Sequence, residues 1–367
     1  MSQSTFLPSY TIGADAYNAI NDIVKPYGTT AVMIGGKTAL EKAANKIKAA
    51  LTNEVSIIDT LWYGGNSTYE NVDTLMQEPS VQTADVLFAV GGGRVCDTVK
   101  VTAEKLGKPV FTFPTIGSNC SPVTAVCVMY TESGEMHGLF FPAKPPTHAF
   151  IDIAIIAEAP DKYLWAGIGD ALSKEIESTF SARGDQLDYT DGLGIQIGKM
   201  CTDRLLTYGT QALTDSAANI PSYSIEQVVL DIIVTTGLVS VLVINDYNSA
   251  MAHSFYYGTT VLAKMEDYLH GASVSYGVLA LLKMDQQEAL FERIYHFMIE
   301  NKLPVCLADM HLNATTDLDA ILDKAMTTHD IVHVPYEITR EMFKEAILAV
   351  EAYHAAQTIP ADFSPIL

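Results

Sequence analysis

Three side chains in the second half of the chain, Asp170, His253 and His270, belong to residue types that bind metal ions. Zn²⁺ takes imidazole nitrogens and carboxylate oxygens, and its catalytic sites use three protein ligands and keep one position open. A metal held in this way would bind a substrate alkoxide and lower the pKa of the hydroxyl, which prepares it to lose a hydride. The two histidines are seventeen positions apart, so they are not neighbours on one helix face. Spacing alone leaves open that both are hydrogen-bonded core or surface residues and that Asp170 is a helix cap.

A second chemical feature is a run of three glycines, Gly91 to Gly93, between an apolar stretch and a helical pattern. The stretch 86–90 is short and apolar, as a buried strand is. Glycines at a strand-to-helix turn let a ligand approach the backbone closely, and the N-terminus of the next helix attracts an anion such as a phosphate. Residues 91–94 are therefore a candidate pyrophosphate cradle. The run is not G-x-G-x-x-G, and a plain tight turn is the alternative.

The elements that must position the glycine turn alternate between strand and helix. Their alternation favours a mostly parallel sheet covered on both faces, with the glycine turn at the carboxyl end of a strand, where such sheets bind ligands. A glycine-containing turn between 123–130 and 136–141 predicts a hairpin. We expect strands at 10–12, 30–34, 55–61, 85–90, 109–113 and 150–156, and helices at 14–27, 37–51, 68–76 and 94–107.

From about residue 160 onward the pattern is helical almost throughout. Residues 167–170 (Gly-Ile-Gly-Asp) indicate a flexible start to a helix, and 228–244 indicates a buried core helix rather than a membrane span. We place the domain boundary near 157–161, which gives an α/β domain at 1–158 and a helical domain at 159–367. Breaks in the helical pattern are expected at Gly192, Pro221, Gly258, Gly277 and Pro304.

Composition restricts the partners. The formal net charge is −21, which disfavours nucleic acid because phosphate binding needs clustered Lys and Arg. Hydrophobic residues make up 49% of the 367 residues, enough for large cores. The five cysteines form no C-x-x-C pair, and the N-terminus shows no secretory signal, so we expect a reduced cytoplasmic protein with no membrane partner.

Six segments together resemble the glycerol dehydrogenase branch of the iron-containing alcohol dehydrogenase family. They occur in the family's order and cover most of the chain up to Gly277. The resemblance implies the dehydroquinate synthase-like fold, with a Rossmann-like dinucleotide-binding domain, an all-α domain and the active site between them. The segments are GGGRVCDTVK (91–100), FPTIGS (113–118), FFPAKPPTHAFIDIAIIAEAP (140–160), AGIGDAL (166–172), AHSFYYGTTVL (252–262) and LHGASVSYG (269–277).

The resemblance also implies roles for individual residues. Asp170, His253 and His270 would be the catalytic ligands of a divalent metal, usually Zn²⁺ in this branch. A hydride would pass between the nicotinamide of NAD(P) and the carbinol carbon of a small-molecule substrate. Relatives are commonly oligomeric, so a homo-oligomer is expected. The implied cofactor-binding residues are Gly92, Gly93, Arg94, Asp97, Thr115, Ser118, Thr124, Val126 and Tyr130.

One departure from the family pattern concerns the substrate. Glycerol dehydrogenases typically carry an Asp where this chain has Cys120, and that carboxylate helps to bind the polyol. A cysteine there resembles the hydroxycarboxylate dehydrogenases of the same family, which reduce 2-oxo acids. Loss of a negative charge beside the metal favours an anionic substrate. Cys120 is thus a candidate substrate residue together with His253, and the alternative is that Cys120 is only a small packing residue.

A second departure concerns the cofactor. The glycerol enzymes have an Asp at the place of Gly36, where it holds the adenosine ribose hydroxyls. Without that carboxylate a 2′-phosphate meets no repulsion, and Lys37 could pair with it, which leans toward NADP. Lys37 could equally be a solvated residue at a helix start.

Two further departures lie beside the metal ligands. Tyr256 stands where relatives often have a histidine, which puts a proton-relaying imidazole there in doubt. Lys174 stands where the iron-dependent branch has a fourth ligand, so three ligands and zinc are favoured.

The leading hypothesis is a metal-dependent NAD(P)H oxidoreductase that interconverts a small alcohol and its carbonyl compound. The alcohol would be a 2-hydroxy acid or a polyol such as glycerol, and glycerol dehydrogenase proper is one alternative. The others are a dehydroquinate synthase-like lyase, whose basic substrate residues are not evident, and a catalytically silent nucleotide-binding protein, against which the retained Asp/His/His set counts.

Overall fold

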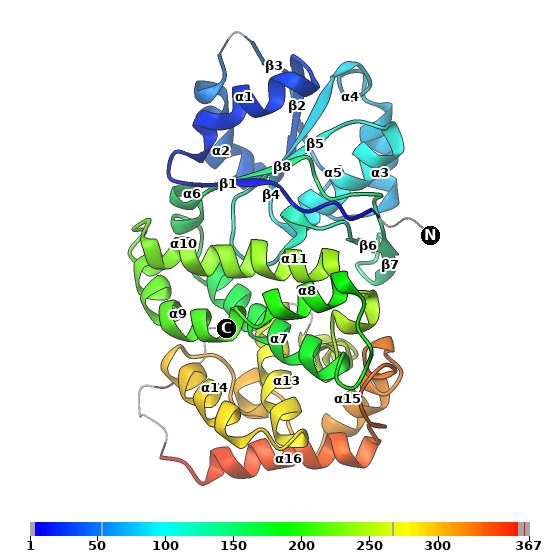
Figure 1. The fold of residues 1–367 in the computed structure, drawn as a ribbon, viewed down its shortest axis with the longest axis vertical. Helices are drawn as coiled ribbons and strands as arrows, with labels where there is room; N and C mark the ends of the chain where they lie inside the picture. The colour runs from blue at the N-terminus through cyan, green and yellow to red at the C-terminus, as the bar shows by residue number, and fades with distance from the viewer. Residues whose placement is uncertain (1–3, 53, 266–267, 359–362, 364–367) are drawn as a thin grey trace. The chain divides into compact units, whose positions relative to one another are not determined.

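The computed structural model describes residues 4–52, 54–265, 268–358 and 363. It forms two compact units. Unit 1 contains residues 1–161 and 215–241, and unit 2 contains residues 162–214 and 242–367. Unit 1 is built around a sheet, whereas the regular structure described in unit 2 is helical (Figure 1).

The sheet of unit 1 has six strands in the order β1-β8-β5-β4-β2-β3. Every neighbouring pair runs parallel, which confirms the predicted parallel sheet. The five strands that we expected before residue 115 agree with the structure to within one residue at either end. The strands are β1 (Tyr10–Gly13), β2 (Thr30–Gly35), β3 (Ser56–Trp62), β4 (Val86–Gly91), β5 (Val110–Pro114) and β8 (His148–Asp152).

Helices cover both faces of this sheet (Figure 1). Alternate side chains of a strand point to opposite faces. Met33 and Phe88 therefore join a core with α1 and α2, whereas Ile34 and Leu87 join another with α3, α4 and α5. Burial on both faces explains why the central strands are continuous apolar runs. The helices are α1 (Ile20–Val24), α2 (Lys37–Ala50), α3 (Tyr69–Gln77), α4 (Pro79–Thr83), α5 (Gly93–Leu106) and α6 (Ile153–Ala157).

The last strand is shorter than the predicted 150–156, because β8 ends at Asp152 and α6 follows at once. The Asp152 carboxylate accepts hydrogen bonds from the backbone N–H groups of Ala154 (3.0 Å) and Ile155 (3.4 Å), so it caps the new helix. A short apolar run does not distinguish a buried strand from a buried helix, which is why the prediction was wrong here.

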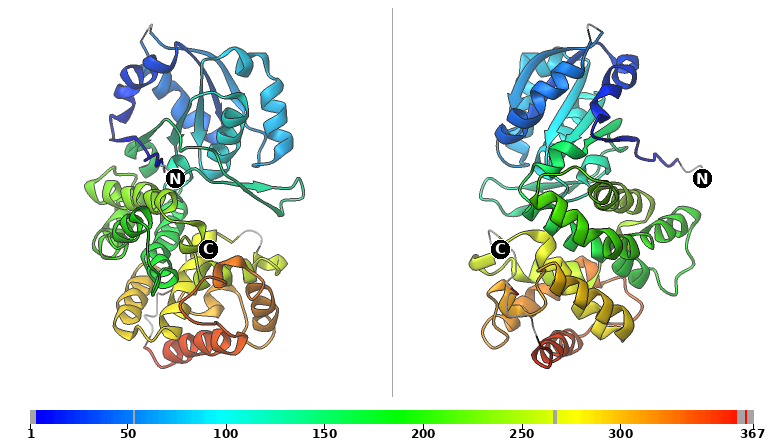
Figure 2. Two further views of the ribbon diagram at one scale, coloured as in Figure 1. Left: turned by 45° about the vertical axis from the view of Figure 1, so that its right-hand side comes forward. Right: turned by 90° about the vertical axis from the view of Figure 1, so that its left-hand side faces the viewer.

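The predicted hairpin is confirmed as β6 (Cys127–Tyr130) paired antiparallel with β7 (Met136–Phe140). Figure 2 shows it projecting from the layered part of unit 1. Its first strand begins later than expected, because Ser121–Val123 forms a 3-10 turn.

Unit 2 confirms the helical second half, but three expected breaks in the pattern were wrong. Gly192, Gly258 and Gly277 lie inside helices, where one glycine costs only about 1 kcal/mol. A Cβ at Gly277 would lie 2.6 Å from the backbone oxygen of Ala252, so this glycine allows a close helix contact. The helices are α7 (Lys162–Ser181), α8 (Tyr189–Gly198), α9 (Cys201–Ala217), α12 (Met251–Thr259), α13 (His270–Met284), α14 (Glu288–Glu300), α15 (Leu318–Ala325) and α16 (Arg340–Ala355).

One apolar helix runs from Tyr223 to Leu242 and consists of α10 (Tyr223–Val229), a π-helical segment (Leu230–Thr235) and α11 (Thr236–Leu242). By length and composition it could cross a membrane, but 72% of its most apolar window is buried inside the structure. This confirms the predicted core helix at 228–244.

The same helix makes the division of the chain differ from the expected 1–158 and 159–367. Residues 215–241 belong to unit 1, although they follow the first helices of unit 2 in sequence. A Cβ at Gly237 would lie 2.3 Å from the Val123 side chain, which shows how closely this helix packs on the segment after β5. Such a long-range contact leaves no local signal in the sequence.

Candidate functional site

Asp170, His253 and His270 converge in unit 2, although they come from three different helices. Asp170 lies in α7, His253 in α12 and His270 at the start of α13. The Nε2 atoms of His270 and His253 lie 3.1 Å and 3.7 Å from Asp170 Oδ1. One ligand atom from each residue lies within 4.8 Å of the other two. The donor types and their spacing therefore fit a single divalent metal ion.

Close packing of α7 and α13 brings two of these residues together. A Cβ at Gly271 would lie 1.8 Å from the Ala166 backbone oxygen, and one at Gly169 would lie 2.5 Å from the Gly271 oxygen. Only glycine permits this approach, which is what allows Asp170 to reach His270. Gly169 and Asp170 are thus inside a helix, so the predicted flexible helix start and the possible Asp170 cap were wrong.

Glu177, which was not among the residues predicted for the site, fixes the orientation of His253. This carboxylate is fully buried, and its Oε2 accepts a hydrogen bond from His253 Nδ1 at 2.5 Å. Its Oε1 accepts from the backbone N–H groups of Ala250 (2.8 Å) and His253 (3.0 Å). Such a partner sets the tautomer of a histidine ligand, here leaving Nε2 to face Asp170. Glu177 follows Asp170 by two helical turns on the same face, and this spacing was the signal available in the sequence.

Electrostatics in the metal-free cluster follow from these contacts. Burial alone would raise the pKa of Asp170, but His270 and His253 lower it to about 2. Burial alone would lower the pKa of His253, but the Glu177 carboxylate raises it to about 9. At neutral pH Asp170 and Glu177 are therefore anionic, and His253 carries a second proton that a bound metal ion would displace.

Lys174 and Tyr256, the two residues beside the ligands that depart from the family pattern, make defined contacts. Lys174 directs its Nζ to Asn248, at 2.9 Å from the side-chain oxygen and 3.0 Å from the backbone oxygen. The Tyr256 ring lies edge-to-face against His270, with the ring centroids 4.1 Å apart. Tyr256 thus packs against a candidate ligand.

The predicted cofactor residues gather at one edge of the sheet of unit 1. Gly36, Gly92 and Thr115 directly follow β2, β4 and β5, which are adjacent strands. The crossover from β2 leads to β3 on one side, and that from β4 leads to β5 on the other. The carboxyl ends of β2 and β4 therefore flank a topological switch point of the sheet, which is where open α/β sheets bind ligands.

The glycine turn has the predicted strand–turn–helix form. Gly91 ends β4 with a φ of +154°, Gly92 caps α5, and Gly93 is its first residue. A Cβ at Gly92 would lie 2.7 Å from Ile116, and one at Gly93 would lie 2.8 Å from Asn119. The segment after β5 thus packs directly on the glycine turn, and a side chain at either glycine would collide with it.

Cations and aromatic rings border this edge. Lys37, the first residue of α2, places its Nζ 5.0 Å from the centroid of the Trp62 ring. Arg94 is exposed and lies 5.1 Å from the centroid of the Tyr130 ring. Gly36 is the N-cap of α2. The nearest neighbours of a Cβ added at Gly36 would be the side chains of Ala39, Tyr63 and Val95, all at 3.9 Å.

Several other predicted cofactor residues are engaged in hydrogen bonds inside unit 1. Asp97 is buried and accepts from the Ser121 hydroxyl at 2.6 Å, and the backbone oxygens of Thr124 and Val126 accept from Lys100. Ser118 accepts from the Asn119 amide at 3.2 Å. Their cofactor contacts stay predictions.

Cys120 is partly buried and lies against the helix 223–242. A Cβ at Gly237 would be 3.6 Å from the Cβ of Cys120. Its expected contact with substrate stays a prediction.

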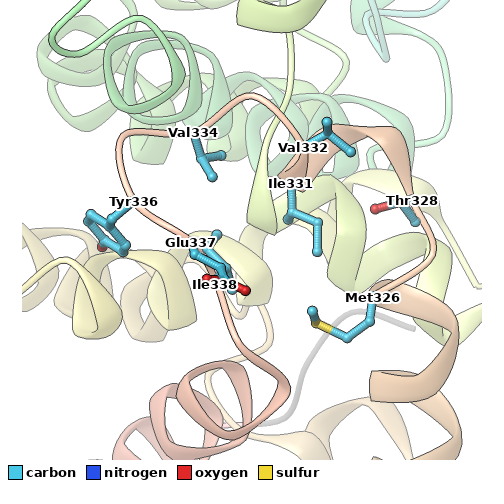
Figure 3. Close-up of a pocket in the computed structure, with 8 residues that line it drawn as sticks. All are labelled: Met326, Thr328, Ile331, Val332, Val334, Tyr336, Glu337 and Ile338. Carbon is cyan, nitrogen blue, oxygen red and sulfur yellow. The ribbon is translucent and has the colours of Figure 1, made fainter.

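A separate hollow of about 420 Å³ lies in unit 2, along the segment between α15 and α16 (Figure 3). One carboxylate and no cation line it, and none of the predicted cofactor or metal residues is among its lining residues. It is lined by Met326, Thr328, Ile331, Val332, Val334, Tyr336, Glu337 and Ile338.

Unit 1 thus has the architecture of a dinucleotide-binding domain, and unit 2 is a helical domain that gathers one carboxylate and two imidazoles. Known proteins share this combination. A probable glycerol dehydrogenase from Sinorhizobium meliloti has the same fold, with a TM-score of 0.84 and 25% identity over 97% of this chain and 100% of the other. The predicted fold class is confirmed.

Sequence comparison agrees over nearly the whole chain. Residues 8–153 match the family model of iron-containing alcohol dehydrogenases. Glycerol dehydrogenase from Thermotoga maritima is 30% identical over 96% of this chain and 98% of its own. Hydroxycarboxylate dehydrogenase A from Escherichia coli is 31% identical over 89% of this chain and 90% of its own. The chain therefore belongs to the iron-containing alcohol dehydrogenase family, in its glycerol dehydrogenase-like branch, and it is an alcohol oxidoreductase.

Proposed function

We propose that this oxidoreductase uses NAD(P) and a divalent metal to interconvert a small 2-hydroxy acid or polyol and its carbonyl compound. The observation that carries the proposal is the convergence of Asp170, His253 and His270, with ligand atoms within 4.8 Å of one another. When bound, the metal supplies a Lewis acid that polarises the substrate oxygen, and the nicotinamide accepts or returns the hydride.

In this proposal the protein's own residues hold the metal and the cofactor and orient the His253 ring. Asp170, His253 and His270 bind the metal, and Glu177 keeps His253 Nε2 turned toward Asp170. Gly92, Gly93 and the N-terminus of α5 receive the cofactor pyrophosphate. In this proposal the alcohol proton travels through water or a cofactor hydroxyl.

The metal is zinc in this proposal. The described ligand set has three members, and Lys174, at the place of a fourth ligand in relatives, is hydrogen-bonded to Asn248. Three N and O ligands with one open position suit catalytic zinc. Metal analysis of active protein tests this, and active protein with no divalent ion would overturn it.

The cofactor preference is for NADP. Gly36 supplies no carboxylate to repel a 2′-phosphate, and the contact with Trp62 holds the Lys37 ammonium near the end of β2. NADPH should bind more tightly than NADH, and Lys37→Met should remove that difference. Equal affinities in the wild type would show that the preference is wrong.

The substrate preference is for a 2-oxo acid and 2-hydroxy acid pair. Relatives named for glycerol and for hydroxycarboxylates match this chain with nearly equal identity, so Cys120 is the position that decides. Cys120→Asp places a carboxylate there and should lower kcat/KM for 2-oxo acids about tenfold or more while raising it for glycerol. Cys120→Ser, which adds no charge, is the control.

The decisive experiment follows nicotinamide absorbance with a panel of 2-oxo acids, aldehydes and polyols, using both cofactors. Turnover of one class that disappears in His270→Ala is expected. Full activity of that variant would sink the assignment of the metal ligands. Cofactor binding without turnover of any substrate would favour a silent binding protein, and turnover without a nicotinamide signal would favour a lyase.

The proposed enzyme is cytoplasmic, with a small-molecule substrate as its partner, and it self-associates. None of the five cysteines, all within the described residues, forms a disulfide, as expected in a reducing compartment. Light scattering of the purified protein tests self-association, and a mass of one chain would contradict it.

A further inference from the structure

A buried lysine, Lys100, lies at the centre of the segment 118–128 that follows β5. Its side chain is 1% exposed. The Nζ donates to the backbone oxygens of Ser121 (2.9 Å), Thr124 (3.3 Å) and Val126 (2.7 Å), and to the Thr124 hydroxyl (3.3 Å). Asp97 Oδ1 lies 3.0 Å away. An ammonium group has three N–H donors, and here they are shared among five oxygens.

The charge of this lysine is balanced inside the unit. Asp97 is buried as well, and its second oxygen accepts from the Val128 backbone N–H at 3.1 Å. Burial raises the pKa of the Cys96 and Cys127 thiols to about 12, so both are neutral and Asp97 is the counter-charge. Burial alone would lower the pKa of Lys100, but the Asp97 carboxylate 3.0 Å away shifts it upward, so the lysine stays charged.

The segment takes its shape from this cation. Three carbonyl groups of one short stretch point to the same place, where their dipoles repel one another unless a positive charge lies between them. A buried carbonyl without a partner costs about 1–3 kcal/mol. Without the ammonium the segment must therefore rearrange, because the carbonyls cannot stay buried and unpaired.

The same segment borders the proposed cofactor and substrate positions. The Ser121 hydroxyl, whose proton goes to Asp97, lies 3.3 Å from the Gly93 backbone oxygen, and Asn119 packs on Gly93. Cys120 lies between these two residues. A rearranged segment would therefore change the space above the glycine turn and the position of Cys120.

We infer that Lys100 is a positioning residue, whose ammonium takes the place of a bound cation and holds the segment 118–128 in the form that receives the cofactor and places Cys120. The inference rests on the proposed function for its catalytic meaning. The geometry of the segment stands without it.

The test compares Lys100→Met and Lys100→Ala with Lys105→Met. Lys105 lies in the same helix, but it is partly exposed, pairs with Asp73 at 3.3 Å and lies 5.1 Å from the centroid of the Tyr69 ring. We expect each Lys100 variant to weaken NADPH or NADH binding at least tenfold and to raise the KM of the substrate. Zinc affinity should not change, because the proposed ligands all lie in unit 2. Backbone amides in 118–128 should exchange hydrogen faster, and Lys105→Met should behave as the wild type.

Chemical rescue separates a cation role from general damage. Ammonium or propylammonium ions should restore part of the cofactor affinity of Lys100→Ala, whereas tetramethylammonium, which has no N–H donor, should not. Restoration by neither donor ion, or by all three ions equally, would overturn the inference.

A second variant covers loss of folding. If both single variants fail to fold, Lys100→Met combined with Asp97→Asn removes both members of the buried pair and should fold with faster amide exchange in 118–128, a readout that does not depend on the predicted cofactor contact of Asp97. Cofactor binding equal to the wild type in that variant, or in Lys100→Met, would overturn the inference. Failure of the wild type to bind either cofactor would instead sink the proposed function, and hydrogen exchange in 118–128 would then decide the role of Lys100.

Discussion

Glu177 orients the His253 imidazole for metal binding, although Glu177 is not itself a proposed ligand. The carboxylate is fully buried, and it accepts hydrogen bonds from the His253 ring and from two backbone N–H groups at the start of α12. We predict that Glu177→Gln lowers zinc affinity about 10- to 100-fold, since partners of this kind typically contribute that much. Competition with a chromogenic chelator measures it. Glu175→Gln, which changes a partly buried carboxylate two positions away, beside Thr202, should leave the affinity unchanged. Equal losses in both variants would contradict the prediction.

Individual site residues can be predicted from the sequence when their residue type itself indicates the chemistry. Asp170, His253 and His270 were identifiable as candidate ligands, and the structure brings them together. Glu177 and Lys100 were not, because their roles depend on burial and on contacts 76 and 21 to 26 positions away. Glutamate and lysine on a helix are usually solvated, so their residue types did not mark them, and the spacing of Glu177 from Asp170 was a signal that their types did not supply.

The contact between α7 and α13 is the element on which the candidate metal site depends. We predict that Gly271→Ala destabilises the protein by more than about 3 kcal/mol and abolishes zinc binding, because its Cβ would lie 1.8 Å from the Ala166 oxygen. Denaturant unfolding measures the stability. Gly192→Ala is the control, since its Cβ meets nothing within 4 Å and should stabilise α8 by about 0.5–1 kcal/mol. A tolerated Gly271→Ala would show that the helices can move apart.

The pairing of β1 with β8 should make stability depend on pH. His148 in β8 is buried between the hydroxyls of Ser9 (2.7 Å) and Thr11 (2.9 Å), and burial lowers its pKa to about 4. The unfolded histidine binds a proton near pH 6.5 but the folded one does not. Stability is therefore full above pH 6.5 and falls as the pH drops toward 4, by up to about 1.4 kcal/mol per pH unit. His148→Gln should remove this part of the pH dependence, as unfolding curves at pH 7.5 and 5 would show. The same loss in the variant would contradict this.

Elements with a clear period were predictable and those set by distant contacts were not. The central strands are apolar on both faces, so their type followed from their sequence. The helix after Asp152 depended on a cap that the apolar run did not reveal. The glycines at 258 and 277 looked like breaks because their function, contact with a neighbouring element, appears only in three dimensions.

At the scale of the whole molecule the excess of negative charge should govern the response to salt. Acidic residues number 43 and basic residues 22, which gives the net charge of −21. Repulsion of this kind opposes the compact state and is screened by salt. We predict that the melting temperature rises by several degrees between about 10 mM and 500 mM NaCl. Sucrose at equal osmolality should not reproduce the salt dependence of the unfolding midpoint, and an unchanged or falling melting temperature would contradict the prediction.

Membership of residues 215–241 in unit 1 also has a consequence for the order of synthesis. A nascent chain of 161 residues already contains all six strands of the sheet, but it lacks the helix that packs on Val123 and lies against Cys120. Unit 1 is completed only after residue 241 has left the ribosome, when α7 and α8 have already emerged. Domains that fold as they are made usually finish in sequence order. Here unit 1 begins first but is completed only when residues 215–241 have been made. The speed of translation through 162–241 therefore sets how long the apolar surface of unit 1 stays uncovered.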